Sequence, residues 1–71
     1  MKQVSADHVK FGKRVRALRS DHMTQEILAA KVGVDRSYIG FLERGEANPS
    51  LTMIIKIAKV LGVQPYQLLK D

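Results

Sequence analysis

Apolar positions along this chain recur at the three- and four-residue spacing that is typical of α-helices. Phe11, Val15 and Leu18 follow one another at i, i+4 and i+7 with lysines and arginines between them, which predicts an amphipathic helix over residues 5–20. Strand signals are weak, because no segment alternates apolar and polar residues over more than a few positions and no Asn-Gly or Asp-Gly turn occurs. The pattern predicts an all-α protein.

Capping residues and glycines divide the rest of the chain into further helices. A side chain that can accept from free N–H groups stands before three of these segments, and a proline opens the last. The expected N-caps are Thr24, Asp35 and Ser50. The expected helices span about residues 25–32, 36–44, 51–61 and 65–70. Together with residues 5–20 they predict a compact five-helix bundle, a single domain over residues 1–71.

The second and third expected helices are short and are joined by about three residues built on Gly33. This spacing matches the helix-turn-helix plan, in which the second helix of the pair enters the major groove of DNA. The inner faces are expected to carry Ile27, Leu28 and Val32 in the first helix of the pair and Ile39 and Leu42 in the second. The outer face of the second is small, polar and basic, as close approach to base edges requires, and carries Arg36, Ser37, Gly40, Phe41 and Arg44.

The expected helix over residues 51–61 is apolar over roughly 220° of its circumference. One side of a small bundle does not easily bury so wide an arc, so part of it is expected to meet a second subunit, together with the 65–70 helix. The residues expected in this dimer interface are Met53, Ile57, Tyr66, Leu68 and Leu69. The alternative is that the 65–70 helix alone covers this face.

The excess of basic residues lies in the N-terminal part of the chain. The net charge is +5, and residues 1–20 hold six basic residues against one acidic residue, whereas residues 21–71 hold six of each. Clustered basic residues and a pI near 9.9 are typical of a nucleic-acid-binding protein. The alternative is an ordinary solvated helix, or one that is attracted to an anionic membrane.

Composition excludes several classes of function. The chain has no cysteine, which removes zinc fingers and thiol chemistry and fits a reducing cytoplasm. No apolar run approaches the roughly eighteen residues of a membrane span, and the first residues lack the apolar stretch of a signal peptide. His8 and His22 lack metal-ligand spacing, and no phosphate loop or nucleophile motif occurs. We expect a cytoplasmic protein that is not an enzyme and uses no metal, cofactor, membrane or small-molecule ligand.

Several segments of the sequence, in this order and spacing, resemble the phage-repressor-type (xenobiotic-response-element) helix-turn-helix family of transcriptional regulators. They are residues 24–34, 37–39, 42–45, 48–51 and 57–63, and the likeness covers nearly the whole chain from Phe11 onward. The word Asp35-Arg36-Ser37-Tyr38-Ile39 is also similar to the recognition helix of controller proteins from restriction-modification systems. Between Leu18 and Gln25 the chain is one residue shorter than the usual family spacing, which predicts a tighter first turn.

The resemblance implies roles for individual residues. The residues facing base edges would be Arg36, Ser37 and Phe41. Arg36 is expected to dominate, because a guanidinium can make a bidentate contact with guanine that is worth roughly 1–3 kcal/mol of discrimination. For Phe41, packing in the core is the open alternative. Gln25, at the start of the scaffold helix, would touch a phosphate and brace the recognition helix, and further phosphate contacts would come from Tyr38, Arg44 and Asn48.

The resemblance also implies a structural ion pair between Arg19 of the first helix and Glu43 of the third. Other basic residues of the first helix are candidates for diffuse phosphate attraction, with a solvated face as the alternative. They are Lys10, Lys13, Arg14 and Arg16. The expected function is a sequence-specific regulator, a homodimer on double-stranded DNA with half-sites roughly 34 Å apart. The alternative is an antitoxin or a protein-interaction module on the same fold.

Overall fold

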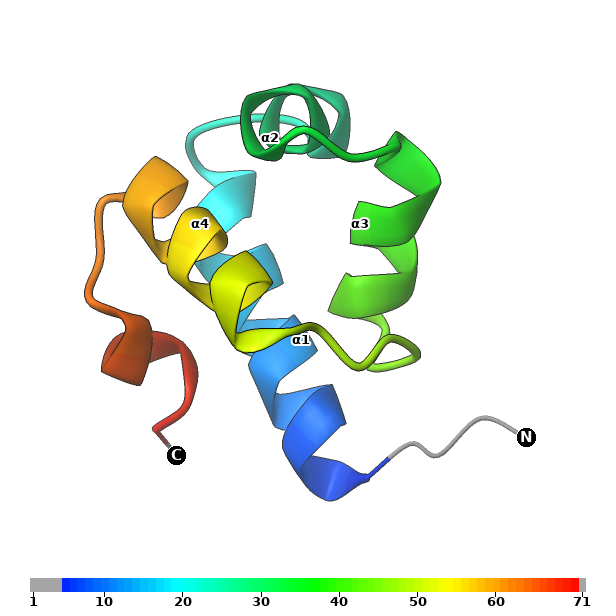
Figure 1. The fold of residues 1–71 in the computed structure, drawn as a ribbon, viewed down its shortest axis with the longest axis vertical. Coiled ribbons are helices and arrows are strands. Elements are labelled where there is room, and N and C mark those ends of the chain that lie inside the picture. Colours follow the sequence, from blue (N-terminus) through cyan, green and yellow to red (C-terminus); the bar gives the residue numbers. More distant parts are fainter. Residues whose placement is uncertain (1–4, 71) are drawn as a thin grey trace.

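Four α-helices and one 3-10 helix make up the fold in the computed structural model, which describes residues 5–70. The elements are α1 (Ala6–Ser20), α2 (Gln25–Val32), α3 (Arg36–Glu43), α4 (Leu51–Leu61) and η1 (Pro65–Leu68). α3 packs on one side of α1 and η1 on the other, while α2 lies across one end against α3 and α4 (Figure 1). The described residues contain no strand, so the all-α prediction is confirmed.

The prediction of a fifth α-helix over residues 65–70 is wrong. The segment that follows α4 forms a 3-10 helix of four residues, and Leu69 already lies at its C-cap. Pro65 lacks a backbone N–H, and the segment is too short to add the i→i−4 bonds that a longer α-helix would supply. The expectation that the first residues form no signal peptide concerns mainly residues 1–4, which lie outside the described part. Within that part, no helix is both long enough and apolar enough to cross a membrane.

Side-chain caps set where the helices begin. The oxygens of Thr24 and Ser50 each accept a backbone N–H at 3.1 Å, and Asp35 accepts the Ser37 N–H at 2.9 Å. Gly33 ends α2 in the left-handed conformation with φ 90°, which a glycine adopts without strain. The three predicted N-caps are therefore confirmed. The turn between α2 and α3 follows from Gly33, which ends α2, and Asp35, which caps α3.

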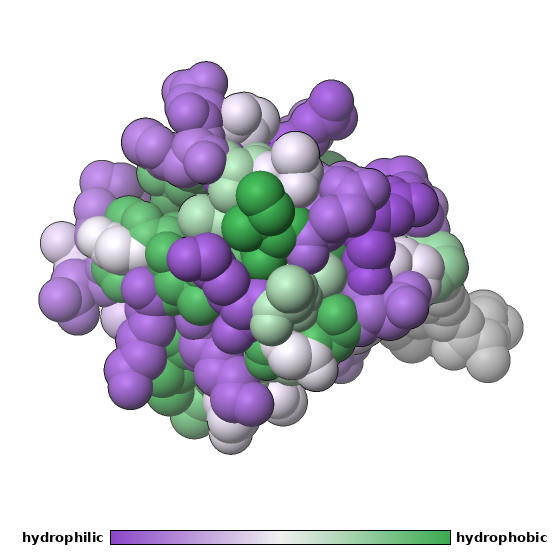
Figure 2. Space-filling view, turned by 90° about the horizontal axis from the view of Figure 1, so that it is seen from above, coloured by the Kyte–Doolittle hydropathy of each residue, from purple (hydrophilic) through white to green (hydrophobic). Residues whose placement is uncertain are grey.

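The core is one cluster to which every element contributes. Its largest fully buried side chains are Val15, Leu28, Ile39, Leu42, Ile57 and Leu68. Ile27, expected to face inward, is instead 46% exposed. α2 buries Leu28, Ala29 and Val32 against α3 and α4, and Ile27 lies roughly 140° around the helix from the middle of that face. Apolar residues accordingly reach the surface between hydrophilic ones at the α2 end of the molecule (Figure 2).

Backbone contact between α1 and α3 occurs at Gly12. A Cβ placed there would lie 2.6 Å from the Glu43 carbonyl oxygen and would also strike the Leu42 carbonyl oxygen. Only a glycine permits this approach. The contact places the middle of α1 against the C-terminal end of α3, and Arg19, two turns further along α1, reaches the Glu43 side chain from there.

Candidate nucleic-acid interface

The outer face of α3 presents a small polar surface to solvent. Arg36, Ser37, Phe41 and Arg44 are exposed along it, whereas Ile39 and Leu42 are buried beneath it. A Cβ on Gly40 would lie 3.2 Å from Nη1 of Arg44 and 3.9 Å from Nη1 of Arg36. Because Gly40 has no side chain, the two guanidinium groups can lie over the same stretch of backbone.

Phe41 is 41% exposed and does not belong to the buried core. The Arg44 guanidinium carbon lies 5.2 Å from the centre of its ring, which is a cation–π distance. Arg44 also lies 3.4 Å, Nε to Oε2, from Glu46. The end of α3 therefore offers an aromatic ring covered by a cation, next to one acidic residue.

The start of α3 is organised by Asp35. Its carboxylate accepts both the backbone N–H and the hydroxyl of Ser37. These hydrogen bonds from Ser37 hold the pKa of the Asp35 carboxyl below its ordinary value of 3.8. The carboxylate therefore stays ionised at the positive end of the helix dipole. Since the Ser37 hydroxyl already donates its hydrogen to Asp35, its oxygen can only accept a hydrogen bond from an outside partner.

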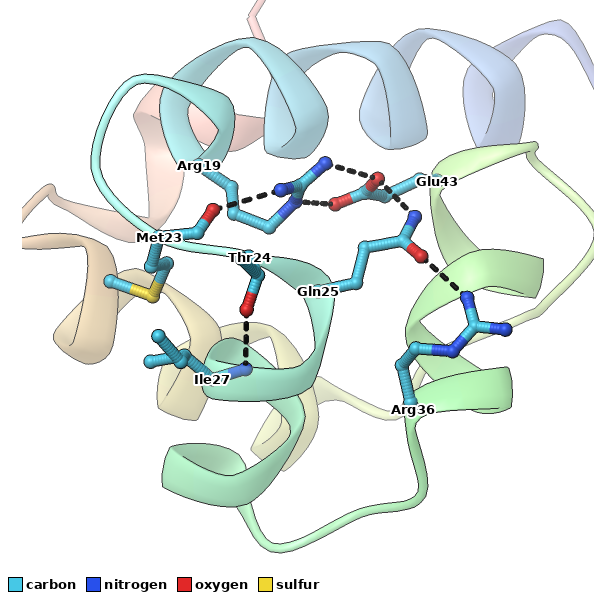
Figure 3. A network of polar contacts seen from close by, with 7 residues as sticks. All are labelled: Arg19, Met23, Thr24, Gln25, Ile27, Arg36 and Glu43. Carbon is cyan, nitrogen blue, oxygen red and sulfur yellow. Dashed lines mark hydrogen bonds and ion pairs between the residues drawn. The ribbon is translucent and has the colours of Figure 1, made fainter.

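A polar network connects the ends of α1 and α3 to the start of α2 (Figure 3). Arg19 donates to both carboxylate oxygens of Glu43, at 2.5 Å from Nε and 3.1 Å from Nη2. The side chains of this pair are only 10% and 2% exposed. Gln25 donates from Nε2 to Oε1 of Glu43 at 2.9 Å, and its own Oε1 accepts from Nη1 of Arg36 at 2.7 Å. Four side chains are thus joined end to end, from the interior to the surface of α3.

Tyr38 is half-buried against the core, and this burial raises the pKa of its phenol above the ordinary value of 10.0. A tyrosine hydroxyl is protonated at neutral pH with or without this shift, and it can donate to an anion. Asn48 is exposed in the segment between α3 and α4. It lines a hollow beside the N-terminal turn of α1, with Asp7 and His8, and so stands apart from the Gln25–Arg36 end of α3.

A family model described as helix-turn-helix matches residues 13–68, which includes α2, the turn at Gly33 and α3. The chain belongs to the helix-turn-helix family. The control protein C.BamHI of Bacillus amyloliquefaciens is 49% identical over 61 residues, covering 83% of this chain and 75% of that protein. This confirms the family resemblance that the sequence suggested.

Solved structures of helix-turn-helix proteins share the whole fold. The restriction-modification controller protein C.AhdI of Aeromonas hydrophila matches with a TM-score of 0.85 and 49% identity, over 90% of this chain and 98% of that one. The P22 c2 repressor, in complex with a synthetic operator, matches with a TM-score of 0.79 and 34% identity, over 84% of this chain and 92% of that one. The family binds DNA, and α2, the turn at Gly33 and α3 lie within the matched part of this chain.

Most basic residues of α1 do not share the surface of the recognition helix. Lys10, Lys13 and Arg14, with Lys70, line a shallow hollow of about 310 Å³. At about 100° per residue, the three α1 side chains lie roughly 100–160° around the helix from Gly12, which faces α3. Much of the charge excess that pointed to nucleic acid therefore lies on the far side of α1 from the recognition helix.

The expected dimer residues divide into two groups. Ile57 and Leu68 lie in the core with 0% and 1% of their surface exposed, so they offer no area to a second subunit. The periodic pattern cannot distinguish these positions from the outer face, because α4 is apolar around most of its circumference. Met53 is half-buried, whereas Tyr66 and Leu69 are 64% and 60% exposed. Leu51 and Ile55, which were not assigned to an interface, are exposed as well.

The structural role of Gly12 was missed from the sequence, and Gly40 was assigned to the outer face without its role between the two arginines. Gly12 allows the α1–α3 contact, and Gly40 provides space between Arg36 and Arg44. A signal was available, because a glycine inside a helix costs about 1 kcal/mol relative to alanine and implies a packing reason. Periodicity marks which side of a helix a glycine occupies, but not what approaches it there.

Proposed function

We propose that this helix-turn-helix transcription regulator binds a pseudo-palindromic operator as a homodimer and reads base edges with α3. The observation that carries the proposal is the position of Arg36. Its guanidinium is exposed at the N-terminal end of the recognition helix and is held there by Gln25 of the scaffold helix. A held guanidinium suits bidentate recognition of guanine O6 and N7 in the major groove.

Base contacts are assigned to Arg36, Ser37 and Phe41. Ser37 would accept from a base amino group, since its own hydrogen is donated to Asp35. Phe41, exposed outside the core, would meet a thymine methyl group. Phosphate contacts are assigned to Gln25, Tyr38, Arg44 and Asn48. Support comes from the exposed cation at Arg44, the protonated phenol of Tyr38 and the exposed amide of Asn48.

The homodimer is proposed to form through the exposed apolar residues of α4 and the C-terminal segment. Leu51, Ile55, Tyr66 and Leu69 provide this surface, with Met53 at its partly buried side. A two-fold pair would place two recognition helices about one helical turn of DNA apart, roughly 34 Å. Joining two half-sites in this way gives an affinity that one eight-residue recognition helix does not reach alone.

The biological setting proposed is control of a restriction-modification operon in the cytoplasm. It is supported by the likeness to C.BamHI and C.AhdI at 49% identity each. The regulator would act by occupying operator DNA, without enzymatic activity, cofactor, membrane or small-molecule ligand. Its own concentration would then set its activity, through dimerisation and operator occupancy.

Fluorescence anisotropy tests the proposal. The wild-type protein first selects a duplex from a random-sequence pool, and its affinity for that duplex is compared with a scrambled duplex near physiological salt. We expect a preference of about a thousandfold or more, sharply reduced by Arg36→Ala and unchanged by Lys56→Ala on α4. Equal and weak binding of both duplexes would contradict sequence-specific function.

A protein-interaction module such as an antitoxin is the second candidate, and the exposed apolar residues of α4 and η1 are the observation that favours it. A monomeric protein without sequence preference, which binds a different protein through Tyr66 and Leu69, would support this candidate over the regulator.

A further inference from the structure

The orientation of the Gln25 amide is fixed from both sides. Glu43 presents carboxylate oxygens, which only accept hydrogen bonds, and Arg36 presents guanidinium N–H groups, which only donate. The amide must therefore turn its NH₂ group to Glu43 and its oxygen to Arg36, and the 2.9 Å and 2.7 Å distances show this arrangement. The reverse orientation would set donor against donor and acceptor against acceptor.

Glu43 is itself held firmly. Two hydrogen bonds from Arg19 fix both of its oxygens, and Arg19 is anchored in turn through Nη1 to the Met23 carbonyl oxygen at 2.9 Å. Within the described residues, no buried side-chain nitrogen or oxygen lacks a hydrogen-bond partner. The buried end of the network therefore has a single arrangement, while its outer end reaches the exposed guanidinium of Arg36.

Arg36 keeps most of its donors for an outside partner. A guanidinium has five N–H donors, and Gln25 takes one of them. Glu26 lies 3.8 Å from Nε, which is beyond hydrogen-bond distance. Gln25 is therefore the single described residue that fixes the guanidinium through a short hydrogen bond. It leaves four N–H donors, and a bidentate contact with guanine needs only two of them.

We infer that Glu43 is a positioning residue for DNA recognition, which sets the Gln25 amide and through it the Arg36 guanidinium. This inference rests on the proposed function. The ion pair with Arg19 would then contribute to sequence discrimination as well as to folding. A purely structural pair predicts a different result, because a change in the folded fraction weakens binding to every duplex by the same factor.

The experiment measures the ratio of affinities for two duplexes that differ at one base pair, and not the affinity for a single duplex alone. In the selected operator, the base pair whose replacement harms the wild-type protein but not Arg36→Ala identifies the guanine that Arg36 contacts. Affinities for the intact and the replaced duplex are then measured for Glu43→Gln, for Gln25→Leu, and for each combined with Arg36→Ala. Glu46→Gln is the matched control, since Glu46 also pairs with an arginine at the end of α3 but is exposed and lies outside the network. Thermal unfolding shows whether each variant is folded at the assay temperature.

We expect the wild-type protein to discriminate by roughly 5- to 150-fold at this base pair. Glu43→Gln and Gln25→Leu should each reduce that ratio at least about fivefold, with no further reduction in the Arg36→Ala background, and Glu46→Gln should leave it unchanged. Gln25→Leu keeps the Arg19–Glu43 pair, so it remains informative if Glu43→Gln unfolds.

An unchanged ratio in Gln25→Leu, or equal losses on both duplexes in a folded Glu43→Gln, would overturn the inference while leaving the proposed function intact. Failure of the proposed function is distinct, because the wild-type protein would then select no operator at all.

Discussion

At the residue scale, Glu43 belongs both to a buried ion pair that stabilises the fold and to the hydrogen-bond network that reaches the candidate recognition surface. Its carboxylate is buried, bonded to Arg19 and bonded to the side chain that holds Arg36. A buried charge of this kind depends on its partner, because desolvation is costly and only the opposite charge and hydrogen bonds offset it. The exposed pair of Arg44 and Glu46 at the same end of α3 has no such dependence.

Removal of Arg19 leaves the Glu43 carboxylate buried without its cation. We expect Arg19→Ala to lower the free energy of unfolding by about 3–5 kcal/mol. Glu46→Ala, the exposed control, should change it by no more than about 0.5 kcal/mol. Urea denaturation followed by circular dichroism measures both, and a loss below about 1 kcal/mol in Arg19→Ala would show that the pair is not buried in solution.

The hydrogen bonds that Asp35 accepts at the start of α3 can be tested by measuring its pKa. Because hydrogen bonds from Ser37 lower its pKa in the folded state, the stabilising contribution of the carboxylate is present above the ordinary value of 3.8 and is lost as the pH falls through the lowered value. An NMR titration should find the Asp35 pKa below 3.8 in the wild-type protein and closer to 3.8 in Ser37→Ala. The same pKa in both proteins would remove Ser37 as its cause.

At the element scale, local signals in the sequence predicted the boundaries of the four α-helices but not the 3-10 helix, and tertiary contacts explain what these signals missed. Thr24, Asp35 and Ser50 could be identified as caps because capping depends on neighbouring residues alone. Ile27 could not be assigned correctly, because a two-turn helix contains too few positions to define its buried face. The Arg19–Glu43 pair was suggested by family resemblance, and its link to Arg36 depends on distances that no spacing rule provides.

Gly12 provides the prediction at this scale. Gly12→Ala adds a methyl group against the carbonyl oxygens of Leu42 and Glu43, which are backbone atoms that cannot rotate away. We expect a loss of about 1–3 kcal/mol in the free energy of unfolding, in spite of alanine's higher helix propensity. Lys13→Ala, at an exposed position of the same helix, is the control and should stay within about 0.5 kcal/mol. Stabilisation by Gly12→Ala would mean that α1 and α3 are farther apart than the structure places them.

At the scale of the whole molecule, the exposed apolar residues and the recognition helix belong to different elements. Tyr66 and Leu69 belong to the C-terminal segment, whereas Arg36 begins α3. The sequence predicted an interface in this part of the chain but included Ile57 and Leu68, which the fold uses in its own core. The packing of α4 against α2 and η1, and of η1 against α1, decides which apolar side chains remain outside.

Because Tyr66 and Leu69 are exposed and lie outside the buried core, we predict that dimerisation can be uncoupled from folding. Tyr66→Asp combined with Leu69→Asp should raise the dimer dissociation constant at least roughly thirtyfold in sedimentation equilibrium, with the helical content unchanged. Lys56→Asp, a charge change elsewhere on α4, is the control. A double variant that still sediments as a dimer would place the interface elsewhere.

Contact between Arg36 and guanine in the major groove depends on a single DNA atom, the guanine N7, which can be removed by chemical substitution. Replacing the guanine in each half-site of the selected operator by 7-deazaguanine removes the N7 acceptor and leaves base pairing and the minor groove intact. We expect a loss of about tenfold in affinity for the wild-type protein and none for Arg36→Ala. An equal loss in both proteins, or no loss in either, would contradict recognition of guanine by Arg36.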